Sequence, residues 1–287
     1  KGLFCEIMGK NGAVNNGVGG SQHINRGNYY STGIQGESLP VSSGVALSLK
    51  RTNNDNVSIS FIGDGTWGEG AVYEALNMCS LWTLPSIVIC ENNQISQSTS
   101  SEKNLSGTIE KRANSFNIDY VKISEDSTVN KIEEILSPLF SRVRTNRCPL
   151  IVEVKSKRIS SHSKGDDTRD EKLISQLKSR DWYELLNKKN NDFKLLVNKI
   201  KNEINDIVID INNSNFSKSK YIPSTIDFSN QIKHSNKDVV NEKVLENLNK
   251  AMSEIMQIDN KTFIIGEDIE DPYGGAFKAT KGIHSNF

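Results

Sequence analysis

Two apolar runs, each followed by polar residues, constrain the fold of this chain more than any other stretch. Val57–Ile62 alternates apolar and polar residues, and residues 69–82 carry apolar side chains at helical spacing. Ser86–Cys90 is a short continuous apolar run, which is typical of a strand buried on both faces. A strand, a helix and a second strand in this order predict a parallel pair joined by a right-handed crossover.

The same alternation continues towards the C-terminus. Strands are predicted at residues 120–123 and 150–154, with a helix at 129–143 between them. We therefore expect a doubly wound α/β domain with a parallel sheet. Further helices are predicted over residues 39–51, 168–186, 192–211 and 239–256, and a further strand over 262–265. The expected apolar faces are Val41, Val45, Ala46, Leu47 and Leu49 for helix 39–51, and Val72, Ala75, Leu76, Cys79 and Trp82 for helix 69–82.

Composition changes along the chain indicate how it is divided. Residues 1–36 are rich in glycine, which predicts a loop system rather than a packed element. Residues 212–237 are rich in Asn, Ser and Lys and contain Pro223, as is typical of a linker. We therefore expect a first domain over residues 1–211 and the start of a second domain of the same α/β type over 238–287.

Charge and hydropathy exclude two classes of function. The 287 residues include 35 Lys and Arg against 35 Asp and Glu, and this balance argues against a nucleic-acid binder, which would carry a basic excess. The mean hydropathy of -0.49 and the absence of an apolar run of about twenty residues argue against a membrane span. The four cysteines form no C-x-x-C pair and are interpreted as reduced thiols, so a cytoplasmic protein is expected; no signal peptide is visible.

Polar residues at the ends of the first two predicted strands indicate a binding site. Asp64 follows the first strand and Asn93 the second, and the carboxyl ends of parallel strands meet at one edge of a sheet. A carboxylate and an amide oxygen suit Mg²⁺, which completes its shell with phosphate oxygens and water. Gly63, Gly65 and Gly68 let backbone approach a phosphate, and the following helix directs free N–H groups there. The alternative is two tight turns, since Asp-Gly and Asn-Asn are common turn residues.

The pattern resembles a known fingerprint. Gly63-Asp-Gly65 followed by an Asn-Asn pair, with Asn93 placed 29 residues after Asp64, resembles the thiamine-diphosphate motif. The surrounding residues are similar to the α part of 2-oxo acid dehydrogenase E1 components. The segments that carry this resemblance are Gly19-Gly-Ser-Gln-His23, Gly33-Ile-Gln-Gly-Glu-Ser-Leu-Pro40, Gly63–Asn77, Leu84-Pro85 and Arg158-Ile-Ser-Ser-His-Ser-Lys-Gly-Asp-Asp167.

The C-terminal residues resemble the opening of the E1 β part. The similar segments are Val244–Met252, Phe263–Asp268 and Asp271–Lys278. The resemblance therefore implies a fused α and β E1 that is truncated at both ends. It further implies that the glutamate acting on the aminopyrimidine lies past Phe287 and that a diphosphate-binding Tyr-Arg segment precedes Lys1. The 287 residues alone are then expected to be inactive.

The resemblance also implies cofactors and residue roles. The cofactors are thiamine diphosphate and Mg²⁺, with Mg²⁺ held by the side chains of Asp64 and Asn93 and by the carbonyl of Ile95. The backbone of Gly63, Gly65 and Thr66 meets the diphosphate, and the backbone of Gly33 and Gln35 meets the aminopyrimidine. His162 is the expected catalytic and cofactor-contacting residue on a loop at the mouth of the site, although its serine neighbours also suit a solvated loop histidine.

The implied reaction is oxidative decarboxylation of a 2-oxo acid, with acyl transfer to a lipoyl group of an E2 partner. The run from Arg158 to Asp167 resembles branched-chain enzymes more than pyruvate enzymes, and both substrates stay open. A homodimer is expected. Two departures, Gln35 in place of an apolar residue and Ser160-Ser161 before His162, keep alternatives open: an acetoin dehydrogenase, a transketolase-like enzyme, or a non-catalytic cofactor-binding relative.

Overall fold

The structure is a computed structural model with two compact units, each described by itself below. The first unit contains residues 1–160 and 171–220, and the second contains 161–170 and 221–287. Within these units the structure describes residues 1–163, 165, 167–217, 243–260, 262, 264, 266 and 268–287. Most of the predicted linker at 212–237 therefore lies outside the described residues, as do Phe263 and Ile265 of the strand predicted at 262–265.

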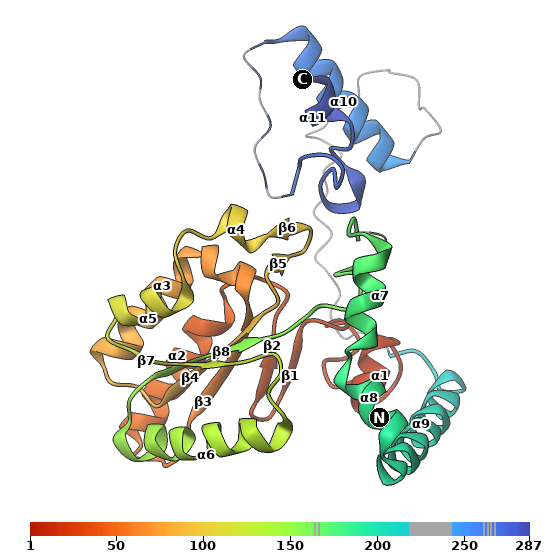
Figure 1. The fold of residues 1–287 in the computed structure, drawn as a ribbon. Helices are drawn as coiled ribbons and strands as arrows, with labels where there is room; N and C mark the ends of the chain where they lie inside the picture. The colour runs from red at the N-terminus through yellow and green to blue at the C-terminus, as the bar shows by residue number, and fades with distance from the viewer. Residues whose placement is uncertain are drawn as a thin grey trace. The chain divides into compact units, whose positions relative to one another are not determined.

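A parallel sheet forms the centre of the first unit (Figure 1). Its four strands lie in the order β3-β4-β8-β7, and all neighbouring pairs are parallel. The strands are β3 (Ser58–Gly63), β4 (Ser86–Asn92), β7 (Asp119–Ile123) and β8 (Leu150–Lys155). The predicted strand–helix–strand unit and its parallel pairing are confirmed, as is the α/β class.

Helices cover both faces of this sheet (Figure 1). They are α2 (Ser38–Arg51), α3 (Gly70–Leu81) and α5 (Ile109–Ser115) on one face and α6 (Val129–Asn146) on the other. Alternation along β4 supplies both cores, because Val88 and Cys90 pack towards α3 while Ile87 packs towards α6. Burying both faces explains why β4 reads as a continuous apolar run.

The expected apolar face of α2 was wrong at Val41 and Val45 and correct at Ala46. Val41 and Val45 are 40% and 49% exposed, while Leu39, Ser43 and Ala46 are buried. Successive residues of an α-helix are about 100° apart, so a residue two positions from Leu39 lies on the far side of the helix. Small side chains at positions 43 and 46 let α2 approach α3 and β3 closely. Trp82 was also misplaced: it follows the last residue of α3 and is 43% exposed.

The glycine-rich N-terminal segment is more ordered than a loop system. It contains α1 (Gly2–Ile7) and an antiparallel hairpin of β1 (Ile24–Arg26) and β2 (Tyr29–Ser31). Glu6 of α1 is 1% exposed, and its carboxylate accepts backbone N–H groups from Asn15 at 2.6 Å, Gly17 at 3.0 Å and Gly19 at 2.7 Å. One buried carboxylate thus organises the loop from residue 15 to 19.

Glu6 gives a pH-dependent contribution to stability. Burial raises the pKa of Glu6, but four backbone hydrogen bonds to the carboxylate together lower it by more. The pKa in the folded state therefore lies below its ordinary value. The carboxylate therefore stabilises the fold above the ordinary pKa, and this stability is lost as the pH falls through the folded pKa. We expect Glu6→Gln to cost about 2 kcal/mol of unfolding free energy at neutral pH, and less in acid.

Urea denaturation of both proteins at several pH values measures this difference. The matched control is Glu133→Gln, because Glu133 is exposed on α6. A difference in unfolding free energy between wild type and Glu6→Gln that stays constant from neutral pH to acid would contradict the stabilising role of the ionised Glu6 carboxylate.

Four further helices lie in the described part of the first unit. They are α4 (Ser101–Asn104), α7 (Glu171–Ser179), α8 (Trp182–Lys189) and α9 (Asn191–Asn212), so the helix expected at 168–186 is divided in two. Lys10 ties the N-terminal segment to the end of α9, since its ammonium donates to the carbonyls of Asn212 at 3.2 Å and Ser214 at 2.9 Å.

The described part of the second unit is small. It contains α10 (Val244–Ile258), the 3-10 turn η2 (Ala276–Lys278) and α11 (Ile283–Asn286). The Asn249 amide of α10 donates to the carbonyl of Ala279 at 2.8 Å, and Asp271 accepts the backbone N–H of Gly282 at 2.9 Å. Across the residues that the structure describes, no helix is long and apolar enough to cross a membrane.

Candidate cofactor site

Asp64 lies at the carboxyl end of β3, where the chain enters the 3-10 helix η1 (Asp64–Gly68). The residue is only 2% exposed. In the parallel register Gly63 stands opposite Glu91, so Asp64 lies beside the end of β4 and the Asn92-Asn93 step that follows. The structure therefore places the two polar clusters at one edge of the sheet, as the sequence predicts.

A short hairpin covers Asp64. It consists of β5 (Ile95–Ser96) and β6 (Thr99–Ser100). A Cβ atom added at Gly65 would stand 2.5 Å from the Cβ of Ser96, so only glycine permits this approach of η1 to β5. The Ser101 hydroxyl, just past β6, donates a hydrogen bond to the Asp64 carboxylate. Sequence reasoning missed Ser101, because no local pattern marks a contact across 37 residues.

The turn after β4 is closed by its own side chains. The Asn92 amide oxygen accepts the backbone N–H of Gln94 at 3.1 Å, and the Asn93 amide oxygen accepts that of Ile95 at 3.1 Å. This geometry agrees with the turn interpretation of Asn-Asn. It does not exclude a metal, since an amide oxygen has two lone pairs and one such bond leaves a second for a cation.

The loop at residues 33–36 packs against η1 and the start of α3. The Thr66 hydroxyl donates to the side-chain oxygen of Gln35 at 2.6 Å. A Cβ atom at Gly36 would stand 2.8 Å from the Cβ of Glu69, which fixes the loop close to that junction. The structure thus brings Gln35 and Gly36 against Thr66 and Glu69, while Gly33 packs against Gln22.

The donor set at this edge fits Mg²⁺. Among the described residues, no group of three or more His, Cys, Asp or Glu side chains could hold a metal. The described residues therefore contain no metal site rich in thiolate, imidazole or carboxylate ligands. One carboxylate, one amide oxygen and one backbone carbonyl leave positions for phosphate oxygens, as Mg²⁺ prefers. Cβ atoms at Gly63 and Gly68 would meet nothing within 4 Å, so the protein itself does not require glycine at these two positions.

The structure does not assign His162 to this site. His162 belongs to residues 161–170, which group with the second unit, and its neighbours Lys164 and Asp166 lie outside the described residues. The nearby Asp167 pairs with the Arg169 guanidinium at 2.8 Å within the same segment. The role of His162 therefore stays a prediction.

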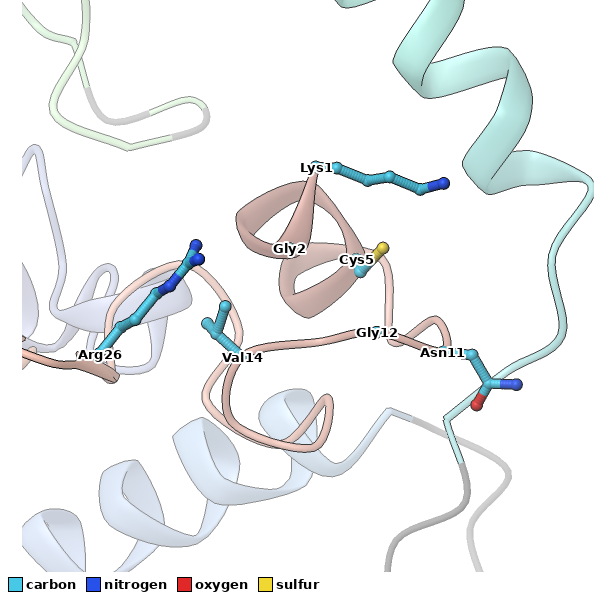
Figure 2. A pocket seen from close by; sticks show the side chains of 7 residues that line it. All are labelled: Lys1, Gly2, Cys5, Asn11, Gly12, Val14 and Arg26. Carbon is cyan, nitrogen blue, oxygen red and sulfur yellow. The ribbon is translucent and has the colours of Figure 1, made fainter.

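A hollow of about 420 Å³ lies elsewhere in the first unit (Figure 2). Figure 2 shows the guanidinium of Arg26 and the small side chains of Cys5 and Val14 around it. Its lining residues are Lys1, Gly2, Cys5, Asn11, Gly12, Val14 and Arg26. None of them is a predicted site residue, so the chemistry points to the strand ends rather than to this hollow.

A parallel α/β sheet with polar groups at its carboxyl edge belongs to the class of folds that bind ligands beyond the carboxyl ends of their strands. The chain belongs to the dehydrogenase E1 component family, whose sequence model matches residues 1–223.

Three relatives illustrate the similarity. The chain is 32% identical over 217 residues to the pyruvate dehydrogenase E1 component subunit alpha of Rickettsia felis. The aligned region covers 74% of this chain and 66% of the relative. It is 34% identical over 187 residues to the corresponding subunit of Rickettsia typhi, and the aligned region covers 63% of this chain and 57% of the relative. The testis-specific mitochondrial form of Rattus norvegicus is 31% identical over 167 residues, covering 58% and 42%. The matches thus span less than two thirds of these relatives.

Proposed function

We propose that this chain supplies the Mg²⁺ and diphosphate half of a thiamine-diphosphate site in a 2-oxo acid dehydrogenase E1. The reaction is oxidative decarboxylation of a 2-oxo acid, with acyl transfer to a lipoyl group of an E2 partner. The observation that carries the proposal is the buried Asp64 at the end of β3, beside the Asn92–Ile95 turn, in a chain of the E1 family.

Each candidate residue has one task in this proposal. Asp64, Asn93 and the carbonyl of Ile95 hold Mg²⁺. The backbone of Gly63, Gly65 and Thr66 contacts the diphosphate, that of Gly33 and Gln35 contacts the aminopyrimidine, and His162 acts at the entrance, near the diphosphate and the lipoyl group. Bound thiamine diphosphate supplies the electron sink for decarboxylation, while the chain anchors it, orients it and excludes water.

The side chain of Gln35 has a defined partner in this arrangement. Its oxygen accepts the Thr66 hydroxyl at 2.6 Å, so the polar group is turned towards η1. The aliphatic stem of Gln35 is then available to pack where relatives of this family carry an apolar residue.

The proposal extends to the organisation of the whole protein. We infer an E1 α-type domain over residues 1–211, a linker over 212–237 and the start of an E1 β-type pyrimidine domain over 238–287, with homodimers as the assembly. The end of the family match at residue 223 supports a boundary within 212–237. The helix α10 lies within residues 238–287, and its helical spacing is consistent with the start of a second domain there.

Pyruvate is the first candidate substrate, because the relatives above are pyruvate dehydrogenase subunits. A branched-chain 2-oxo acid is the second, favoured by the run from Arg158 to Asp167. Reductive acylation of a lipoyl domain by the assembled enzyme, with pyruvate and 2-oxoisovalerate compared, ranks the two.

Calorimetric titration of thiamine diphosphate into the assembled enzyme tests the cofactor assignment. We expect binding in the presence of Mg²⁺ and none in EDTA, because Asp64 and Asn93 would hold the diphosphate only through the metal. ADP is the matched control, since it shares the diphosphate and lacks the thiazolium and aminopyrimidine rings. Absence of Mg²⁺-dependent binding would overturn the proposal, and equal binding of ADP would reduce it to a general diphosphate site.

A further inference from the structure

A buried carboxylate lies beneath the candidate metal turn. Glu153 of β8 is 5% exposed and points to the same face of the sheet as Cys90 and Ile151. One of its oxygens accepts the Tyr120 hydroxyl at 2.5 Å, and the other accepts the Asn92 amide at 2.7 Å and lies 3.1 Å from the Lys155 ammonium. Burying a charge is costly unless it is paired and hydrogen-bonded, and here both oxygens have partners.

Asn92 connects this carboxylate to the turn. Its NH₂ group donates to Glu153, and its oxygen accepts the Gln94 N–H at 3.1 Å. An ionised carboxylate can only accept, so it selects the NH₂ end of the Asn92 amide. The oxygen end must then face the turn. A flipped amide would set two acceptors against each other at Glu153 and two donors against each other at Gln94.

The backbone of Asn92 is fixed as well. Its carbonyl accepts the N–H of Ser156 at 3.1 Å, which locks the end of β4 to the end of β8. The next residue is Asn93, whose oxygen closes the turn onto Ile95. The two candidate metal-binding positions after β4, Asn93 and Ile95, therefore lie in a turn that begins at Asn92. Glu153 sets the orientation of Asn92.

We propose that Glu153 is a positioning residue for the metal site: through Asn92 it holds the 92–95 turn so that Asn93 and Ile95 present their oxygens to the cation beside Asp64. This inference rests on the proposed function. Groups that orient metal ligands contribute strongly to affinity, and removing one typically weakens metal binding by about 10- to 100-fold.

Three variants separate positioning from stability. Glu153→Leu has a similar size and no acceptor, and we expect the Mg²⁺ concentration needed for half-maximal thiamine-diphosphate binding to rise about 10- to 100-fold. Glu153→Gln keeps an acceptor oxygen for Asn92 and should restore most of the affinity. Tyr120→Phe removes only the hydrogen bond at the other oxygen, so it should lower the melting temperature and leave the Mg²⁺ requirement at the wild-type level.

Asn92→Asp is a second route if Glu153→Leu fails to fold. It keeps an oxygen for Gln94 but sets a second acceptor against Glu153. Added negative charge alone would strengthen Mg²⁺ binding at this edge, whereas lost positioning weakens it. We expect weaker binding, and tighter binding would overturn the inference.

Amide hydrogen exchange at Gln94 and Ile95 gives a readout that needs no cofactor. We expect faster exchange at both amides in Glu153→Leu and wild-type rates in Tyr120→Phe. If the wild type binds thiamine diphosphate and the Glu153 variants match it in affinity and exchange, the positioning role is wrong while the proposed function stands. If no protein binds the cofactor but exchange responds as expected, the proposed function fails and Glu153 still orders the turn.

Discussion

Replacement of Asp64 by alanine is expected to weaken Mg²⁺-dependent binding of thiamine diphosphate by more than about 100-fold. This exceeds the loss that is typical when a residue that only orients a metal ligand is removed. Asp64 is the only carboxylate assigned to the cation, and it is 2% exposed at the strand end. Neither the Asn93 amide nor the Ile95 carbonyl carries a net charge to replace it. Calorimetry with saturating Mg²⁺ measures the loss directly.

Thermal unfolding gives an independent view of the same variant. A ligand present at 100 times its Kd stabilises the folded state by about 2.7 kcal/mol. The wild type should therefore melt at a higher temperature when Mg²⁺ and thiamine diphosphate are added, and Asp64→Ala should show no such shift. Without cofactor the variant should be close to wild type, because the alanine removes a buried charge along with its hydrogen bond from Ser101.

Ser101→Ala is the matched control for this experiment. It removes the hydroxyl that donates to Asp64 and leaves the carboxylate free to bind a cation. We expect it to retain Mg²⁺-dependent binding. Wild-type affinity in Asp64→Ala would place the cation elsewhere, and loss of binding in Ser101→Ala alone would show that the hydroxyl, rather than the carboxylate, is the essential group.

The parts of the fold that sequence predicts well are those that local periodicity controls. Burial on both faces makes β4 continuously apolar, and the alternation of β3 marks it as a strand, so both strands were predicted to within two residues of their ends. Asp64 and Asn93 became candidate site residues for this reason. The alternation does not identify the buried face of β3, because Ser58 and Ser60 are buried while Phe61 is exposed. The face of α2 was predicted only in part, because a small polar residue such as Ser43 carries no apolar signal.

The contacts that complete the candidate site were not predictable in the same way. Ser101 reaches Asp64, Thr66 reaches Gln35 and Asn92 reaches Glu153 across long stretches of sequence. Each depends on how loops pack, and a polar loop residue looks the same in sequence whether it is solvated or buried. The helix around Glu6 escaped detection similarly, since six residues give little periodicity.

Trp67→Ala is expected to cost about 3–5 kcal/mol of unfolding free energy, which is the usual range for removing a buried aromatic side chain. Trp67 is 0% exposed in the middle of η1, packs in the core with Leu39 and Val72, and donates its indole N–H to the Cys90 sulfur at 3.1 Å. The variant leaves a cavity directly beneath the segment that carries Asp64 and Thr66. Urea denaturation measures the cost.

Trp182→Ala is the matched control, because Trp182 is 64% exposed and contacts only Tyr183 and Phe193 among the aromatic rings of the described chain. We expect it to cost about 0.5–1.5 kcal/mol. Fluorescence distinguishes the two sites, since the chain has 3 tryptophans and a buried indole emits at shorter wavelength. Native emission should move to longer wavelength in Trp67→Ala and to shorter wavelength in Trp182→Ala. A cost at Trp67 no larger than at Trp182 would mean that η1 is not anchored in the core, and the rigid placement of Asp64 would lose its physical basis.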